Sequence, residues 1–227
     1  MRWMTTFVMM WLPVVAAAQE APALKTEKDK LSYAMGMDLG NQLKSRSVDI
    51  DPAIFAHALK DALSGGKTLL TDAEAKAVIV ELQKAMLAKQ AAEAKLVGDK
   101  NKAEGDAFMA ANKAKEGVVT LPSGIQYRVL SAGTGKQPTI EDTVMCQYRG
   151  TLIGGKEFDS SYKSGQPATF PLKKVIKGWA EVLQLMPVGS KWQVVIPPAL
   201  AYGERGTSAD IGPNATLIFD IELVAIK

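Results

Sequence analysis

The sequence predicts an α+β protein in which an all-α N-terminal region precedes an antiparallel β-sheet curled over one short helix. Apolar residues recur at helical spacing from residue 26 to about residue 115. From residue 117 the pattern changes to β-branched runs separated by Gly and Pro turns. The length of 227 residues allows about one and a half average domains, so two domains of unequal size are expected.

The first 18 residues are typical of a secretory signal peptide. Arg2 gives a positive start, Phe7 to Val15 is apolar apart from Pro13, and three alanines precede an expected cleavage point before Gln19. A membrane anchor is the alternative. The apolar run is well short of the roughly 20 residues that span a bilayer, which favours the signal peptide.

Residues 19–70 are expected to form a helical domain. A second helix within it should begin at Asp51-Pro52, an N-cap with proline at the first helical position, and end at Gly65-Gly66. The first helix is indicated by apolar residues that repeat every four positions: Leu31, Met35, Leu39 and Leu43.

Residues 71–115 are expected to form a long connecting helix of about 60 Å. It opens with the capping-box pattern Thr71-Asp72-Ala73-Glu74 and is rich in Ala, Lys, Glu and Gln. The stretch from Gln90 to Lys115 has few large apolar residues and includes Gly98 and Gly105. We therefore expect an exposed, weakened helix there that acts as a spacer.

The first two helices are too short to bury their apolar faces alone, because a unit of about 60 residues is marginal. Pairing with a second copy would bury them, so a homodimer is expected, with Tyr33, Met35 and Met37 as candidate interface residues. The alternatives are that these helices fold back on the C-terminal domain and that the Met residues are ordinary core. His57, on the second helix, is interpreted as a structural side chain.

Residues 116–227 are expected to form the sheet domain. Trp179 to Met186 has helical spacing and predicts the short helix. The predicted strands are the runs Ile125 to Leu130, Thr143 to Leu152, Lys191 to Ile196 and Thr216 to Ala225.

Composition excludes several kinds of chemistry. The single Cys146 and single His57 cannot supply a zinc cluster or an intrachain disulfide, so we expect no metal and no cofactor. Cys146 lies in an alternating strand pattern and is expected to be a buried, inert thiol. The net charge is only +3, without a concentrated basic face, which argues against nucleic-acid binding. Glycine-rich phosphate loops and the G-x-S-x-G nucleophile motif are absent from the sequence.

Six short segments of the second half, in this order, resemble the FKBP-type peptidyl-prolyl cis-trans isomerases. Each is a weak signal alone, but the ordered set is specific. The segments are Gln147-Tyr148-Arg149-Gly150, Phe158-Asp159-Ser160-Ser161, Val175-Ile176-Lys177-Gly178-Trp179, Leu200-Ala201-Tyr202-Gly203, Ile211-Gly212-Pro213-Asn214-Ala215-Thr216-Leu217 and Phe219-Asp220-Ile221-Glu222-Leu223.

The first half, including Leu31-Ser32-Tyr33-Ala34-Met35-Gly36, resembles the N-terminal dimerisation domain of the Mip and FkpA group of this family from Gram-negative bacteria. The resemblance implies a V-shaped homodimer joined through its N-terminal helices, with one isomerase domain at the end of each long helix. It also implies a periplasmic location, with outer-membrane or surface association as an alternative.

The resemblance also implies which residues form the proline pocket. Trp179 would form its floor, and the Ile176 amide and the Tyr202 hydroxyl would hydrogen-bond the ligand. The family often has an aromatic residue directly after the proline matching Pro167, where this sequence has Ala168; Phe170 is either pocket wall or core. The segment from Glu204 to Asp210 lacks the family's frequent His. Catalytic roles are expected for Asp159, Tyr202, Phe158 and Trp179, and substrate binding for Tyr148, Phe170, Val175, Ile176, Ile211 and Phe219.

Such residues suit a reaction that makes and breaks no covalent bond. Rotation of an X-Pro bond has a barrier of about 18 to 20 kcal/mol because amide resonance is lost. An apolar aromatic box can bind the twisted amide better than either planar form. Asp159 would tune the electric field near the rotating carbonyl; from the residues alone, a turn-forming role before Ser160-Ser161 is the alternative.

The expected function is therefore cis-trans isomerisation of X-Pro bonds in secreted or periplasmic proteins as they fold. The alternative is a holdase-type chaperone that binds unfolded chains, with isomerisation secondary. The expected partners are unfolded or partly folded polypeptides that contain proline, and macrolides such as rapamycin as pocket ligands.

Overall fold

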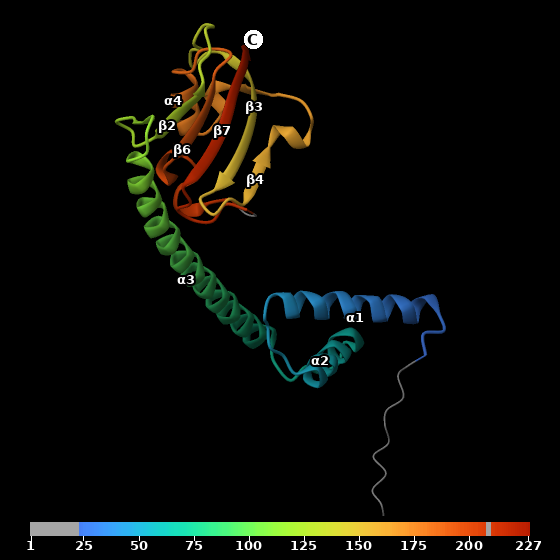
Figure 1. Ribbon diagram of the computed structural model, residues 1–227. Coiled ribbons are helices and arrows are strands. Elements are labelled where there is room, and N and C mark those ends of the chain that lie inside the picture. The colour runs from blue at the N-terminus through green and yellow to red at the C-terminus, as the bar shows by residue number, and fades with distance from the viewer. Residues whose placement is uncertain (1–22, 208–209) are drawn as a thin grey trace, which may run out of the picture. The chain divides into compact units, whose positions relative to one another are not determined.

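The computed structural model describes residues 23–207 and 210–227, and the predicted signal peptide lies outside these residues. The chain divides into two compact units, one up to Ala73 and one from Glu74 to Lys227 (Figure 1). No helix among the described residues is long and apolar enough to cross a membrane.

The first unit holds two helices, α1 (Glu27–Ser45) and α2 (Pro52–Ser64). At the start of α1, Thr26 forms a capping box, because its side chain accepts from the Asp29 amide and the Asp29 carboxylate accepts from the Thr26 amide. Asp51 caps α2 by accepting from two backbone amides, and Gly65 ends that helix in the left-handed conformation, with φ +66°. Both helices lie where the sequence predicts them.

Neither α1 nor α2 contains a buried residue. Their apolar side chains are exposed; Leu31 and Met35 of α1, for example, are 62% and 65% exposed. A single copy of the first unit therefore leaves its amphipathic faces uncovered among the described residues.

Helix α3 (Asp72–Lys113) is continuous over 42 residues, and its last turns contact the rest of the second unit (Figure 1). Gly98, Gly105 and Asn112 are buried. The expectation of an exposed, weakened spacer after Gln90 is therefore wrong at these positions. The two glycines mark places where the helix backbone comes close to another segment, because a residue without Cβ permits that approach.

The described residues after α3 include a seven-stranded antiparallel sheet in the order β1-β2-β6-β7-β3-β4, with β5 paired to β3. The strands are β1 (Val118–Thr120), β2 (Gln126–Ser131), β3 (Thr143–Leu152), β4 (Glu157–Ser160), β5 (Ala168–Pro171), β6 (Lys191–Ile196) and β7 (Leu217–Ile226). The four long runs predicted as strands are β2, β3, β6 and β7. The three shorter strands were not predicted, because segments of three or four residues carry too little alternation.

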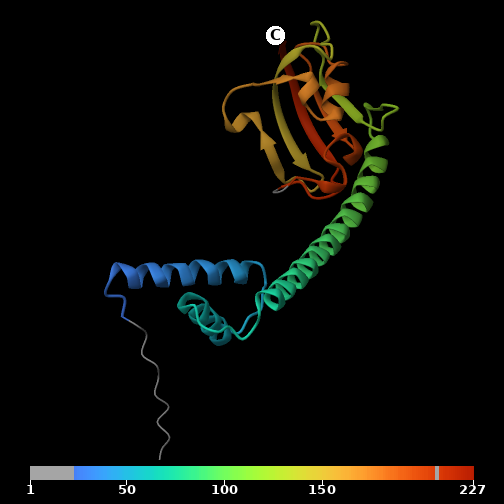
Figure 2. The same cartoon turned by 180° about the vertical axis from the view of Figure 1, so that it is seen from behind.

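The sheet curls over α4 (Lys177–Leu183), seen from the other side in Figure 2. The sequence places this helix at Trp179 to Met186; it begins two residues earlier and ends before Met186, which is nevertheless fully buried. Its buried side chains and the inward residues of β3, β6 and β7 form one hydrophobic core. The described part of this unit also holds four short 3₁₀ turns, at Ser161–Lys163, Leu172–Lys174, Pro198–Leu200 and Gly203–Arg205.

Cys146 is fully buried on β3, and burial raises the pKa of its thiol to about 12. The thiol is therefore protonated at neutral pH, which makes it a poor nucleophile.

Candidate active site

One cavity of about 290 Å³ opens between the sheet and α4. Strands β3, β4, β5 and β7, the start of α4 and the segment around Tyr202 each contribute to its wall. Ten residues line it: Tyr148, Phe158, Asp159, Phe170, Lys174, Val175, Ile176, Trp179, Tyr202 and Phe219.

The indole of Trp179 is the centre of an aromatic cluster. It makes edge-on contacts with the rings of Tyr148, Phe170 and Phe219, with centroid separations of 5.1, 5.4 and 5.3 Å. Phe158 in turn packs edge-on against Phe219 at 5.5 Å. Such T-shaped contacts are the favoured geometry for aromatic pairs, so the rings fix one another and give the cavity rigid apolar walls.

Trp179 Nε1 is buried and has no hydrogen-bond acceptor among the described residues. The indole is held instead by its ring contacts and by α4, whose N-cap residue Ile176 also lines the cavity together with the preceding Val175.

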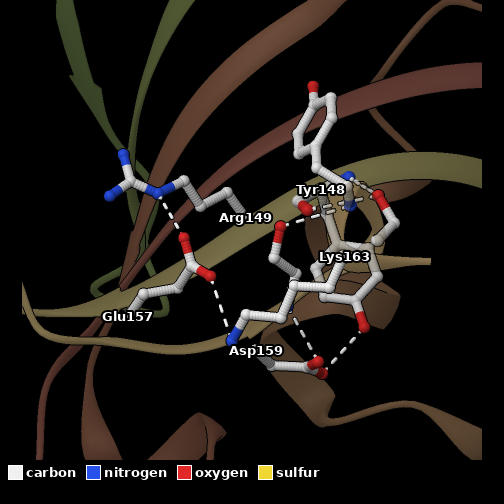
Figure 3. Close-up of polar contacts among 8 residues, drawn as sticks. Tyr148, Arg149, Glu157, Asp159 and Lys163 are labelled. Atoms are coloured by element: carbon white, nitrogen blue, oxygen red, sulfur yellow. Dashed lines mark hydrogen bonds and ion pairs between the residues drawn. The ribbon is translucent and has the colours of Figure 1, made fainter. Parts of the chain in front are cut away.

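The polar side chains that line the cavity are two phenols, one carboxylate and the ammonium group of Lys174. The Tyr148 hydroxyl donates a hydrogen bond of 2.7 Å to Asp159 Oδ2, and the Ser160 amide donates to Asp159 Oδ1 at 2.8 Å (Figure 3). Asp159 lies opposite Gly150 in the β3–β4 ladder, which brings its side chain near Tyr148 two residues earlier on β3. The carboxylate is thus held by two donors at the edge of the cavity.

Both phenols stay protonated at neutral pH. Burial raises the pKa of Tyr148 well above its usual range, and its hydrogen bond to Asp159 raises it further. The pKa of Tyr202 is also raised, first by burial and then by the negative charge of Asp159. Each hydroxyl is therefore a hydrogen-bond donor, and the Tyr202 hydroxyl belongs to a side chain that is 40% exposed at the cavity wall.

A second charged group lies beside the cavity on β4. Glu157 accepts from Arg149 Nε at 2.7 Å and pairs with Lys163 Nζ at 3.1 Å (Figure 3). The hydrogen bond from Arg149, and then the one from Lys163, lowers the pKa of Glu157. Glu157 does not line the cavity, and its charge is paired with those of Arg149 and Lys163.

The structure brings nine of the ten candidate site residues around this one cavity. Phe170, left open as wall or core, lines it. Ile211 does not line it; the side chain is only 5% exposed and packs in the hydrophobic core. Lys174 lines the cavity and was missed, although its position directly before the Val175-Ile176 pair is the signal that marks it.

The cavity therefore combines apolar walls with two neutral phenol donors, one fixed carboxylate and the charged side chain of Lys174. A lining of this kind suits an apolar ring that is attached to an amide.

Comparison with known proteins identifies the family. Residues 134–224 match the family described as "FKBP-type peptidyl-prolyl cis-trans isomerase", and residues 28–129 match "Domain amino terminal to FKBP-type peptidyl-prolyl isomerase". The chain belongs to the FKBP-type peptidyl-prolyl cis-trans isomerases, and it carries the N-terminal domain of their Mip and FkpA members. This confirms the resemblance, the α+β fold and the enzyme class predicted from the sequence.

Individual relatives match over most of their length. "Outer membrane protein MIP" of Legionella longbeachae is 50% identical over 93% of this chain and 91% of its own, and "Peptidyl-prolyl cis-trans isomerase Mip" of Coxiella burnetii is 46% identical over 97% and 96%. The crystal structure of FkpA from Escherichia coli superimposes with a TM-score of 0.69 at 36% identity, covering 90% of this chain and 99% of that one.

Proposed function

We propose that the cavity over Trp179 is the catalytic site and that it accelerates rotation about X-Pro bonds of secreted polypeptides. The observation that carries this proposal is the combination of a rigid aromatic box with the Tyr148–Asp159 pair at its edge. The pyrrolidine ring would pack on the Trp179 indole, between the rings of Phe158 and Phe170. The preceding amide would then lie near the polar edge formed by Asp159 and Tyr202.

The proposed chemistry is selective binding of the twisted amide. Twisting removes amide resonance, so the nitrogen becomes pyramidal and the carbonyl less polar. Apolar walls exclude water, which would otherwise favour the more polar planar amide. The Tyr202 hydroxyl and the Ile176 amide would hold the polypeptide through hydrogen bonds, and Asp159 would act on the rotating carbonyl through its charge, without transferring a proton.

The required stabilisation is modest. A thousandfold acceleration corresponds to about 4 kcal/mol of preferential transition-state binding. One aromatic contact beyond its buried area contributes about 0.5 to 1.5 kcal/mol, so a few such contacts with two hydrogen bonds supply the amount.

The experiment is a peptide turnover assay on the full chain, which follows the cis-to-trans conversion of a short X-Pro peptide. We expect acceleration by the wild-type protein and inhibition by rapamycin, and we expect Asp159→Leu or Tyr202→Phe to slow turnover sharply. Tyr162→Phe is the matched control, because Tyr162 is exposed and does not line the cavity. Unchanged activity in both site variants would refute the site assignment.

We also infer a homodimer in the bacterial envelope. The support is the exposed apolar faces of α1 and α2, together with the match of this region to the N-terminal domain of the family. A relative is named an outer membrane protein, which supports an envelope location, and the predicted signal peptide fits that location.

A holdase-type chaperone activity is the second candidate, favoured by apolar side chains along α3. Leu87 and Leu96 are 66% and 73% exposed and could contact unfolded chains. The full chain saturated with rapamycin should then still suppress aggregation of a denatured client, and Leu87→Ser with Leu96→Ser should weaken that suppression. Ala91→Ser on the same helix is the control. Complete loss of suppression upon rapamycin binding would assign both activities to the pocket.

A further inference from the structure

The second half of α3 packs against the segment that leads into β7. Asn101 Nδ2 donates a hydrogen bond of 2.8 Å to the carbonyl oxygen of Pro213. A Cβ atom on Gly98 would lie 3.2 Å from both Pro213 Cβ and Asn214 Nδ2, and one on Gly105 would overlap Thr216 Oγ1. Residues 98, 101 and 105 share one helix face, so a single stripe of α3 contacts a single loop.

The end of α3 is anchored at a second place. Asn112 Nδ2 donates to Gln126 Oε1 at 2.9 Å, and Gln126 Nε2 donates to the Met109 carbonyl at 2.9 Å. Asn112 and Gln126 are both buried. A buried, paired amide network of this kind fixes geometry, because breaking one bond leaves its partner without water to replace it. The helix is therefore fixed to β2 as well as to the loop before β7.

The loop that α3 contacts is bonded in turn to the segment that carries Tyr202. The Asn214 amide donates a hydrogen bond of 2.8 Å to the carbonyl of Gly203, the residue after Tyr202. Asn214 adopts a left-handed conformation with φ +54°, which Asn tolerates better than most residues. Tyr202 itself lies outside the sheet, between two short 3₁₀ turns, so no strand ladder fixes its position.

We propose that Asn101, with Gly98 and Gly105, positions Tyr202 in the catalytic cavity. Through Pro213 and Asn214, α3 holds Gly203 and so sets where the Tyr202 hydroxyl lies. Asn101 is a positioning residue in this scheme, since it does not line the cavity. The inference rests on the proposed function, and it makes the long helix part of the isomerase site as well as a connection between domains.

The decisive experiment measures how Asn101→Ala changes kcat/KM in two versions of the full chain, the wild type and Tyr202→Phe. In the wild-type background we expect kcat/KM for an X-Pro peptide to fall roughly threefold to tenfold, chiefly through kcat. In the Tyr202→Phe background the same change should cost less than about twofold, because the hydroxyl that it positions is already absent. Lys102→Ala is the control, because Lys102 is exposed and directly follows Asn101 in α3. It should leave kcat/KM unchanged in both backgrounds.

A second pair of variants tests the close approach at Gly105. Gly105→Ala should lower kcat/KM, because the new methyl group displaces Thr216, whereas Gly105→Ala with Thr216→Ala should recover most of it by removing the overlapping Oγ1. Ala103→Val, at an exposed position of the same helix, is the control for added bulk.

The outcomes separate this inference from the function on which it rests. Absence of turnover by the wild-type chain would refute the proposed function. With wild-type turnover present, no loss in Asn101→Ala, or equal losses in both backgrounds, would overturn the positioning role. Full activity of Tyr202→Phe would overturn it too, because no catalytic hydroxyl would then be there to position.

Discussion

The hydroxyl of Tyr148 on β3 donates a 2.7 Å hydrogen bond to the carboxylate of Asp159 on β4. Tyr148 is only 8% exposed, whereas Asp159 lies at the edge of the cavity. The pair thus links the buried aromatic cluster to the polar edge of the site. It keeps the phenol neutral and fixes the direction in which the carboxylate presents its charge.

Removing Asp159 should affect stability and activity separately. Asp159→Leu leaves the Tyr148 hydroxyl without its acceptor, so we expect a loss of about 1 to 3 kcal/mol in the free energy of unfolding. The double variant Asp159→Leu/Tyr148→Phe removes both partners and should recover much of that stability while its turnover remains low. Urea denaturation and the peptide assay measure the two effects. Recovery of turnover in the double variant would show that the charge of Asp159 is dispensable.

Gly150→Ala should perturb the wall of the cavity without touching a polar group. A Cβ atom at this position would lie 2.7 Å from Phe158 Cζ and 2.8 Å from Phe219 Cε1. Both distances are shorter than non-bonded carbon atoms tolerate. The edge-on ring pair would have to shift, so we expect weaker rapamycin binding and slower turnover. Isothermal titration with rapamycin measures the affinity. Gly154→Ala, where nothing lies within 4 Å, is the control and should bind like the wild type.

Much of the fold was predictable because its signals are local. The four-residue repeat from Leu31 to Leu43 and the N-cap at Asp51 depend on neighbours in sequence, and α1 and α2 lie where these signals place them. The approach of Gly105 to Thr216 depends on a residue more than 100 positions away. A glycine in a helix is read from sequence as a weak point, and only the fold shows that another segment occupies the space of its missing side chain.

The candidate site also has residues that the sequence predicts correctly and one, Ile211, that it does not. The ring residues of the cavity other than Phe170 belong to the ordered segments. The structure gathers Tyr148, Phe158, Phe170 and Phe219 because β3, β4, β5 and β7 are neighbours in the sheet. Ile211 belongs to one of those segments, yet its side chain faces the core. Alternation in a strand indicates which side chains point inward, but Ile211 precedes β7 in an irregular segment, where no period applies.

The apolar faces of the first unit lead to a prediction about assembly. We expect light scattering at micromolar concentration to give twice the chain mass. Leu31→Asp with Met35→Asp should shift the protein to the monomer, because these side chains, exposed in the single chain, would place two charges in the inferred interface. Lys44→Asp, at an exposed polar position of the same helix, should leave the dimer intact. A monomer mass for the wild type would refute the inferred homodimer.

Cys146 should make stability depend on pH in the alkaline range. Its pKa is about 12 in the folded chain but close to 9 when unfolded, so below pH 9 both states keep the proton. As pH rises further, the unfolded thiol ionises first and the unfolded state then binds fewer protons, so the free energy of unfolding falls. At pH 10 this loss is on the order of 1 kcal/mol for one such group. Urea denaturation at pH 8 and pH 10 should therefore show a smaller drop for Cys146→Ala than for the wild type. Because the ionisation of the tyrosines contributes to both proteins, only the difference between the two drops reports on the thiol. Equal drops would show that the thiol ionises as easily in the folded chain as in the unfolded one.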